Sequence, residues 1–370
     1  MNLQFGIAGR SVWKRAPWGL IALAAGLFGV GIVNLASATR AEHTPLWLAQ
    51  LVWVGGAYLT VLVLLKVDYE RLYQLAWPFW GLVVFLLVAV EFRGEVAMGA
   101  QRWLVLGPLR VQPSELAKLS VILVLAKIYE DHGERPRGYG LLDLWKPLLV
   151  IGIPAGLTLI QPDLGTALLI AAIGGSLVLV AKVRRSALAV LGASGIVAGV
   201  LAWSFVLRDY QKRRVLAFLD PEADILGSGY HANQSMIAVG SGRWAGKGWG
   251  QGTQTQLSFL PEQHTDFVFS VFAEEWGFRG SALLLVGYLA LCLVGLKIAS
   301  TARDRHGAFL AVGAVALIAS HMLVNIGMVT GLLPVVGVTL PFMSYGRSSG
   351  LTTVLAVGML ANVGARRRQP

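Results

Sequence analysis

The sequence predicts an all-α polytopic membrane protein: a bundle of ten transmembrane helices with a large extracytoplasmic loop between helices 7 and 8, forming one domain over residues 1–370. The chain is 55% hydrophobic and only 14% charged, with a mean hydropathy of +0.64. Soluble domains typically carry about 25% charged residues. In addition, apolar windows close to the roughly 20 residues that cross a bilayer recur along the whole chain. No fixed-period repeat or low-complexity linker divides them.

The apolar windows define the predicted spans in chain order. The first is long enough to cross a bilayer and exceeds the apolar core of a signal peptide, so we expect no cleavable signal. An even number of spans places both termini on one side of the membrane. The predicted spans are residues 18–38, 46–65, 72–90, 115–128, 145–160, 164–181, 188–207, 281–298, 308–332 and 351–363.

The distribution of lysine and arginine indicates which side of the membrane the termini face. Basic residues are frequent before the first span, after the last one, and in the connectors at 66–71, 127–146, 182–185 and 297–305. Because cations in short loops stay cytoplasmic, both termini are expected to be cytoplasmic. The opposite short loops hold only Arg40, Arg93, Arg102, Arg110 and Arg347.

The overall charge indicates which class of partner the chain binds, and the single cysteine limits the disulfides that it can form. The net charge of +11 and the pI near 10.0 would suit nucleic acid. However, the basic residues are scattered in short loops between apolar spans, which fits contact with anionic membrane lipids better. We therefore expect no nucleic-acid partner. Cys292 lies within an apolar span, so an intrachain disulfide is excluded.

The segment 208–280 is the one long interval that is neither an apolar span nor a short connector. It is predicted to face outward as an irregular polar loop, and loops of this length beside membrane helices are usually functional. Residues 209–218 are basic and predict either a short interfacial helix or a solvated charged face.

The chemical centre of this loop is Glu262, His264 and Asp266, followed at once by the apolar run 267–272. Asp266 should lie where water gives way to hydrocarbon, which raises the pKa of a carboxyl group. These donors are compatible with a divalent cation such as Mg²⁺ or Mn²⁺ assisting a pyrophosphate substrate, and equally with no metal. Structural zinc is not indicated, because neither HExxH nor a paired Cys/His set is present.

A glycine-rich stretch, residues 240–252, precedes this centre. Its backbone N–H groups could cradle a phosphate, with Arg243 and Lys247 adding positive charge. The stretch fails the P-loop pattern at Ser241 and Gly248. The alternative is a flexible loop, since glycine is first of all a turn residue.

Charged and polar residues also lie within or beside the predicted spans. Glu115 and Lys118 are three residues apart on one helix face, and either pair beside a substrate cavity or only shield each other. Asp163 either caps the following helix or contacts substrate. His321 and Asn325 are four apart in a span, where a helix-to-helix hydrogen bond is favoured over a ligand role.

Four long motifs carry a resemblance to a known family. Together, in order and over nearly the whole chain, they are similar to motifs of the SEDS family (shape, elongation, division and sporulation proteins). The motifs are QPSELAKL at 112–119, QPDLGTAL at 161–168, GKGWGQGTQTQLSFLPEQHTDFVFSVFAEEWGF at 246–278 and GLLPVVGVTLPFMSYGRSS at 331–349.

The resemblance implies a ten-helix peptidoglycan glycosyltransferase of the bacterial cytoplasmic (inner) membrane. Such an enzyme polymerises lipid II during cell elongation, maintains rod shape, and works with a class B penicillin-binding protein that supplies the transpeptidase. The resemblance also implies that Asp266 is the catalytic acid or base. Glu262, His264, Asp163 and Ser344 are further candidates for substrate contact.

Polymerisation requires a sugar hydroxyl to attack an anomeric carbon while undecaprenyl pyrophosphate leaves. The attacking hydroxyl needs a base, for which Asp266 is suited. The leaving group needs cations, for which the candidates are Lys118, Arg102, Arg243 and Lys247. Two rival functions are a lipid II flippase, which would also need many helices and buried charges, and a scaffold of the cell-wall synthesis complex without chemistry.

One residue departs from the family pattern. The usual SYGGSS is here SYGRSS, with Arg347 in place of the second glycine. Glycine is commonly needed where φ is positive or where another chain approaches closely. Arg347 therefore puts the local loop geometry in question, and is either a tolerated variant or a donor to the pyrophosphate.

Overall fold

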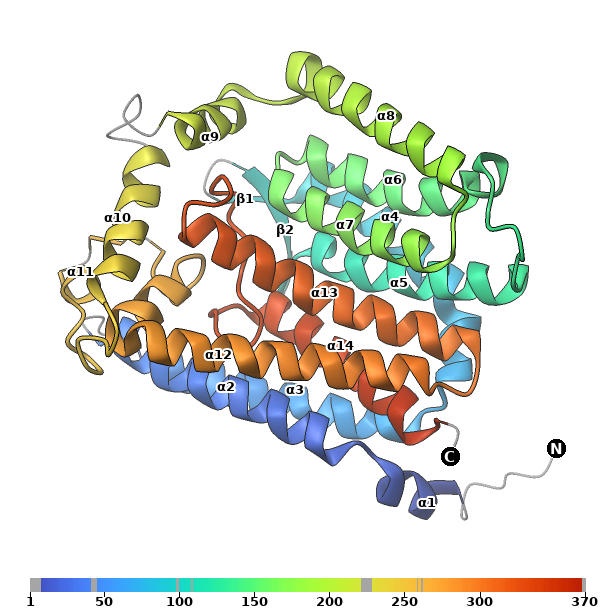
Figure 1. Ribbon diagram of the computed structural model, residues 1–370, viewed down its shortest axis with the longest axis horizontal. Helices are drawn as coiled ribbons and strands as arrows, with labels where there is room; N and C mark the ends of the chain where they lie inside the picture. Colours follow the sequence, from blue (N-terminus) through green and yellow to red (C-terminus); the bar gives the residue numbers. More distant parts are fainter. Residues whose placement is uncertain are drawn as a thin grey trace.

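The computed structural model describes residues 8–40, 45–97, 100–107, 109–220, 228–257, 259–260 and 262–367. Its helices run mostly alongside one another in a bundle, with the N- and C-terminal regions at the same end (Figure 1). The helices are α1 (Ala8–Arg15), α2 (Trp18–Ala38), α3 (Leu46–Lys66), α4 (Tyr69–Arg93), α5 (Pro113–His132), α6 (Trp145–Ile160), α7 (Leu164–Val180), α8 (Arg185–Leu201), α9 (Asp209–Leu219), α10 (Ser228–Ser241), α11 (Thr253–Gln256), α12 (Val268–Ser300), α13 (Arg305–Val329) and α14 (Arg347–Ala365).

Each predicted span coincides with a helix, because a long apolar segment must satisfy its backbone groups internally in lipid. Among the described residues, seven helices are long and apolar enough to cross a membrane: α2, α3, α4, α8 with the π-helical turn Ala202–Val206 that follows it, α12, α13 and α14. The helices α6 and α7 are apolar but shorter. Helix α5 carries charged residues near both of its ends.

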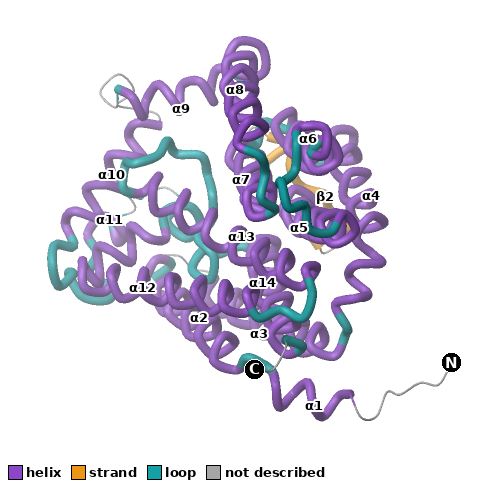
Figure 2. Tube along the Cα trace, turned by 45° about the vertical axis from the view of Figure 1, so that its right-hand side comes forward, coloured by secondary structure: helices purple, strands orange, loops and turns teal. Residues whose placement is uncertain are grey.

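The prediction that the fold is all-α is wrong in one place. Residues between α4 and α5 form a three-stranded antiparallel sheet of β1 (Glu95–Ala97), β2 (Ala100–Leu106) and β3 (Leu109–Val111). The turn between β2 and β3 includes Gly107, whose φ is +63°, a conformation that glycine adopts without strain. The sheet packs against α4 and α5 (Figure 2) and supplies Arg102 to the site described below.

The description of 208–280 as an irregular loop is also corrected. This segment contains α9, α10, α11 and the first turns of α12, which begins at Val268 instead of the predicted 281. Gly277 interrupts α12 with φ +63° and ψ −162°. A Cβ at Gly277 would lie 2.3 Å from the backbone nitrogen of Gly246, so only glycine fits this contact. The segment is therefore a packed structure on the end of the bundle.

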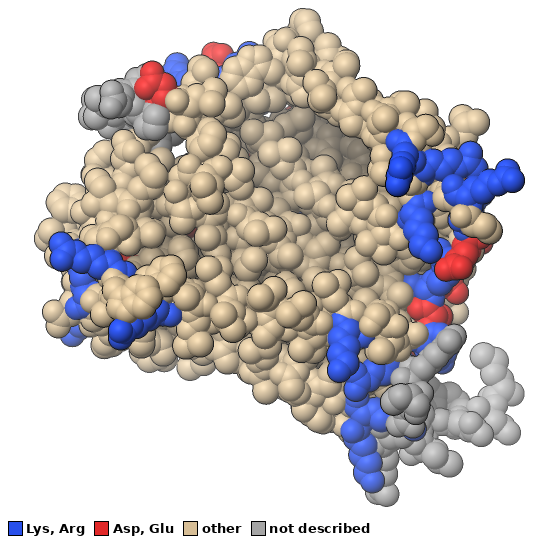
Figure 3. Space-filling model, viewed as in Figure 1, with Lys and Arg blue, Asp and Glu red and all other residues tan. Residues whose placement is uncertain are grey.

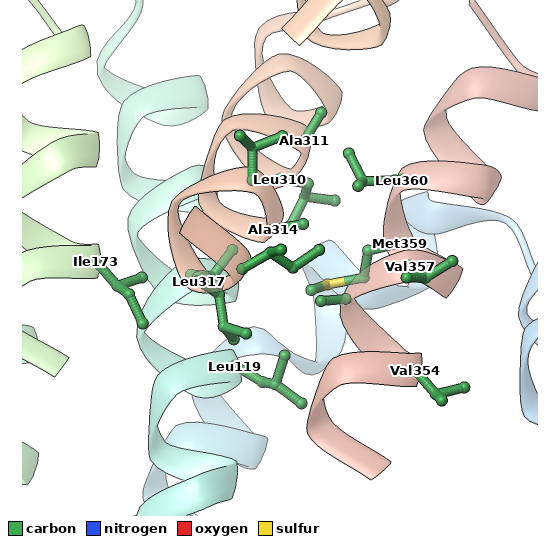
Figure 4. Packing of buried hydrophobic residues seen from close by; sticks show 14 of the residues in the cluster. Leu119, Ile173, Leu310, Ala311, Ala314, Leu317, Val354, Val357, Met359 and Leu360 are labelled. Atoms are coloured by element: carbon green, nitrogen blue, oxygen red, sulfur yellow. The ribbon is translucent and has the colours of Figure 1, made fainter. Parts of the chain in front are cut away.

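The core lies where α5, α7, α13 and α14 meet (Figure 4). Helices α5 and α14 are each buried along most of their length. In contrast, α8 buries only Ala187. It arches with α9 over a hollow that is visible in the space-filling view (Figure 3). Leu119, Leu310, Leu317 and Leu360 illustrate the apolar side chains that interlock at the core.

Side-chain contacts divide the connectors between two ends of the bundle. At the end with the termini, Tyr69 donates to Asp304 Oδ2 at 2.5 Å, and Asn362 Nδ2 donates to Val67 O at 2.8 Å. At the opposite end, the connector before α5 contacts the turn between α6 and α7 through Gln112 and Asp163. The loop 331–346 contacts the segment before α12 through Ser344 and Thr265. We call this opposite set the distal loops.

Candidate active site

The HTDF turn, residues 262–267 before α12, is held by the loop 331–346 and by α13. Ser344 Oγ donates to Thr265 O at 2.6 Å, and Asn325 Nδ2 donates to Asp266 O at 2.8 Å. The same Asn325 nitrogen donates to Val338 O at 2.6 Å. Ser344 thus fixes the turn instead of facing a substrate. The helix-to-helix hydrogen bond predicted for Asn325 is replaced by bonds from α13 to the turn at Asp266 and to the loop 331–346.

Asp266 is partly exposed among charged groups from four elements. The pKa of its carboxyl group is raised to about 6, mainly by burial and next by the negative charge of Glu262. The positive charges of Arg214 and Arg102 act in the opposite direction, and Asp163 raises the pKa slightly. The prediction of a raised pKa for Asp266 is therefore consistent with its surroundings. An acid with a pKa near 6 exchanges protons readily close to neutral pH.

Arg102 and Asp163 form one half of the charged surroundings. Arg102 Nη2 donates to Pro162 O at 2.6 Å, and its Nε lies 3.8 Å from Asp163 Oδ2. Asp163 Oδ1 accepts from Thr166 N at 3.2 Å, so it caps α7. Gln112 Nε2 also donates to Asp163 Oδ2, at 3.3 Å. Asp163 therefore has the capping role that was one of its two predicted roles, and it also orients Arg102.

Arg214 of α9 was missed as a site residue. A Cβ on Gly337 would lie 3.2 Å from Asp266 Oδ2 and 4.0 Å from Arg214 Nη1, so Gly337 sits between the two side chains. Arg214 stacks over the ring of Tyr210 at 5.7 Å, and Tyr210 OH donates to Pro162 O at 2.6 Å. The sequence signal was the basic run at 212–214, which we interpreted as part of an interfacial helix or of a solvated charged face.

The two arginines face a narrow cleft between α9, the α6–α7 turn and the loop 331–346. Arg102, Tyr210, Arg214 and Val336 are among its lining residues, and its volume is only about 10 Å³. A pyrophosphate group does not fit within this volume. Both arginines also lower the pKa of Asp266 through their positive charge.

Glu262 and His264 lie beside Asp266 in the turn. Glu262 Oε2 accepts from Thr265 Oγ1 at 3.1 Å and lies 4.0 Å from His264 Nε2. The backbone N–H of Tyr345 donates to His264 O at 2.8 Å. Over the ranges that the structure describes, no three His, Cys, Asp or Glu side chains are grouped to hold a metal ion. A metal-assisted step stays a prediction.

Glu115 and Lys118 form a buried chain with His321. Lys118 Nζ donates to Glu115 Oε1 at 2.6 Å and lies 2.7 Å from His321 Nε2. His321 Nδ1 in turn lies 3.1 Å from the carbonyl oxygen of Thr339 in the loop 331–346. Lys118 is fully buried, so here it supports the loop beside Asp266 and does not face an open cavity. His321 has a partner on another helix, as its position in a span predicted.

Within the described part of the chain, no hydrogen bond or ion pair joins Lys247 or Arg243 to Asp266. Lys247 Nζ donates to Glu274 Oε1 at 2.6 Å and to Thr253 Oγ1 at 2.8 Å. The backbone N–H of Lys247 donates to Glu274 O at 3.0 Å, and Phe278 N donates to Arg243 O at 2.8 Å. The glycine-rich stretch therefore binds the start of α12, and the interpretation as a phosphate cradle is not supported. Lys247 pairs with a fully buried carboxylate, whereas Arg243 is exposed.

Arg347 is the first residue of α14, where its backbone is helical and its side chain exposed. Its φ is not positive, so the geometric reason for glycine does not apply at this position. Among the described residues its guanidinium has no hydrogen-bond or ion-pair partner, while its carbonyl accepts from Trp53 Nε1 at 2.9 Å. The arginine is accommodated as a local variant.

We expect an Arg347→Gly variant to keep turnover within about twofold of the wild type, because an exposed residue without partners contributes little beyond helix propensity. The measurement is glycan polymer formed per minute by the two purified proteins. A decrease of more than tenfold would instead assign Arg347 to the pyrophosphate.

These observations define the class of protein: a multi-pass helical membrane protein with a titratable acid and two arginines held among loops at one end of its bundle. The chain belongs to the FtsW, RodA and SpoVE family, because the family model described as "Cell cycle protein" matches residues 16–369. This confirms the resemblance to SEDS proteins.

Relatives and solved structures agree with this family. Peptidoglycan glycosyltransferase MrdB of Escherichia coli K12 is 41% identical over 313 residues, 84% of this chain and 83% of the relative. A chain in "Structural coordination of polymerization and crosslinking by a peptidoglycan synthase complex" is 36% identical with a TM-score of 0.81, over 96% of this chain and 99% of that one. Rod shape determining protein RodA of Thermus thermophilus is 31% identical with a TM-score of 0.71, over 97% and 99%.

Proposed function

We propose that this protein is a peptidoglycan glycosyltransferase that polymerises lipid II in the bacterial cytoplasmic membrane during cell elongation. The observation that carries the proposal is Asp266, a carboxyl group with a pKa raised to about 6 and facing Arg102 and Arg214. The relatives named as peptidoglycan glycosyltransferases favour an enzyme over a flippase or a scaffold. The partner expected from the peptidoglycan synthase complex is a class B penicillin-binding protein.

In the proposed step, the ionised Asp266 accepts the proton of the attacking sugar hydroxyl. The hydroxyl oxygen forms a bond to the anomeric carbon of the second sugar, and the bond from that carbon to the pyrophosphate oxygen breaks. The electron pair of the broken bond leaves with undecaprenyl pyrophosphate. General-base catalysis of this kind typically contributes about 100- to 10,000-fold in rate.

The leaving pyrophosphate requires positive charge, which Arg102 and Arg214 supply in this proposal. Arginine presents a planar set of donors that matches phosphate oxygens in pairs. The two side chains come from β2 and α9. In this proposal an outward movement of α9 widens the cleft, while the loop 331–346 stays in place and holds the turn through Ser344. If Mg²⁺ or Mn²⁺ assists, a chelator should lower the rate and the added ion should restore it.

The proposed orientation has ten crossings and both termini in the cytoplasm. In Figure 3, Lys and Arg gather mainly at the end of the bundle that carries the termini. The connectors at this end follow α3, α5, α7 and α12, and cations in short connectors mark the cytoplasmic side. The distal loops and Asp266 then face the outside, where peptidoglycan is assembled.

Labelling of single cysteines tests this orientation. In a Cys292→Ser background, Ala245→Cys should react with an impermeant maleimide from the outside, and Arg137→Cys only after the membrane is opened. Both positions are exposed at opposite ends of the bundle. Equal labelling of the two from one face would contradict the proposed topology.

The decisive assay uses purified protein in detergent supplied with lipid II. Glycan strands show that this chain is the polymerase. Transfer of lipid II across a vesicle membrane without strands would identify a flippase. If neither strands nor transfer occurred while the protein still bound the penicillin-binding protein, the scaffold function would remain.

The polymerisation rate should increase as pH rises through about 6, because the base acts in its ionised form and the pKa of Asp266 lies near that value. Stability of the protein at each pH is checked in parallel by re-assaying at pH 7.5 after exposure. A rate that is flat between pH 5 and pH 7.5 would separate catalysis from the ionisation of Asp266.

A further inference from the structure

Four basic side chains surround a cavity of about 860 Å³ at the end of the bundle that carries the termini. Lys14 and Arg15 end α1, Lys297 lies in the last turn of α12, and Arg367 follows α14. None of the described residues that line the cavity is acidic. The remaining lining is small or hydroxylated: Ala16, Ser300, Thr301, Ala302, Gly364 and Ala365.

The four cations have no partner within the part of the chain that the structure describes. None of them donates a side-chain hydrogen bond or forms an ion pair, and each side chain is exposed. The adjacent Arg366 shows the contrast, since its Nη1 donates to Asn362 Oδ1 at 2.8 Å and its Nη2 to Leu65 O at 3.1 Å. Like charges converging on one space repel one another unless an anion joins them.

Favourable contacts with helix C-termini account for part of this charge. Cations stabilise the last turn of a helix, and α1, α12 and α14 all end here. That interaction would be satisfied by side chains spread over the surface. It does not explain why cations from three helix ends line one large cavity with a small-residue wall, an arrangement that leaves room for a ligand.

Aromatic residues place the cavity at the membrane surface. The rings of Trp13 and Trp18 stack at 5.7 Å, and Trp18 Nε1 donates to Trp13 O at 3.0 Å. Tryptophan is enriched at the level of lipid headgroups. Helix α1 packs against α3 and α14 and so carries Lys14 and Arg15 at this level, just outside the start of the first spanning helix.

We propose that this cavity binds the phosphate headgroup of an anionic phospholipid, such as phosphatidylglycerol or cardiolipin. Basic pockets between membrane helices on the cytoplasmic side are suited to such headgroups. The headgroup would connect α1, α12 and α14, so the lipid would also stabilise the bundle. The inference rests on the proposed membrane placement and is independent of the polymerase chemistry at Asp266.

The test compares the wild type with a variant in which Lys14, Arg15, Lys297 and Arg367 are all changed to Gln. Each protein is purified in detergent, and bound phosphatidylglycerol and phosphatidylcholine are counted by native mass spectrometry during titration. We expect the variant to bind phosphatidylglycerol at least about tenfold more weakly, since each basic side chain near an anionic lipid surface contributes roughly fivefold. The phosphatidylglycerol-dependent increase in Tm should disappear with it.

A matched control carries the same charge change at the same end of the bundle, with Arg137, Lys146, Lys182 and Arg185 changed to Gln. These side chains are exposed and lie outside the cavity lining. The control should keep wild-type affinity, and a Lys297→Arg variant should do so as well. Equal losses in variant and control, unchanged binding by the variant, or displacement of the lipid by millimolar glycerol phosphate would each overturn the proposal, the last by showing a site for free anions.

Discussion

An Asp266→Asn variant is expected to lose about 100- to 10,000-fold in polymerisation rate while it folds and inserts normally. The amide keeps the size of the side chain but cannot accept the proton of the attacking hydroxyl. The turn should keep its geometry, because the backbone carbonyl of Asp266, which the substitution leaves in place, accepts the hydrogen bond from Asn325. The measurement is the initial rate of glycan formation from lipid II by purified protein.

Stability gives this variant an internal control. The pKa of Asp266 is raised in the folded protein, mainly by burial. The ionised form therefore disfavours the folded state increasingly as pH rises from the ordinary carboxyl range through about 6, and the cost is complete above that pH. The neutral Asn variant should be at least as heat-stable as the wild type at pH 7.5, and a lower Tm would mean that structural damage explains the lost rate.

A second control is Asp220→Asn, which makes the same chemical change at an exposed position in the same outer segment. It should polymerise at the wild-type rate. If the Asp266→Asn variant kept more than about a tenth of the wild-type rate, a loss far below the range for a missing base, Asp266 would position the substrate. Glu262→Gln would then be the next variant to assay, since Glu262 is the nearest other carboxylate in the turn.

The helices were predictable because bilayer physics constrains them locally. A segment such as α2 needs only its own apolar residues to form a spanning helix, and its bounds agree with the predicted 18–38. The predicted bounds were wrong where a helix extends beyond its apolar, membrane-spanning part. The start of α12 carries Glu274 and Glu275, which lower the local hydropathy although the backbone is already helical from Val268.

The candidate site was only partly predictable, because contacts between distant segments determine it. Asp266 could be found from its motif and its position before an apolar run. The proximity of Arg214 to Asp266 could not be predicted from the sequence. It depends on α9 folding back over the turn after α6, where Tyr210 contacts Pro162. Lys247 was wrongly predicted to be a site cation. It forms an ion pair with Glu274, which lies 27 residues further along the chain. Charge and motif alone did not distinguish these two cations.

Replacing Lys118 by Met is expected to have the second largest effect. The change leaves Glu115 buried without its cation, and an uncompensated buried charge typically costs about 3–5 kcal/mol. His321 loses its contact with the Lys118 ammonium at the same time, and His321 contacts the loop that lies against Asp266. We therefore expect a large decrease in apparent Tm and a loss of polymerisation. The surface pair of Arg135 and Asp143, 2.6 Å apart, provides the comparison. Arg135→Met should cost no more than about 1 kcal/mol.

A double variant, Lys118→Met with Glu115→Gln, separates support of the fold from positioning of the loop. It removes both charges of the pair, so most of the lost Tm should return. Activity should stay low, because His321 still lacks the ammonium that holds it 2.7 Å away and orients its other nitrogen toward Thr339. The loop 331–346 contributes Gly337 beside Asp266 and Ser344 beneath the turn, so a small displacement reaches the reacting carboxylate. Full recovery of both Tm and turnover would show that the pair serves stability alone.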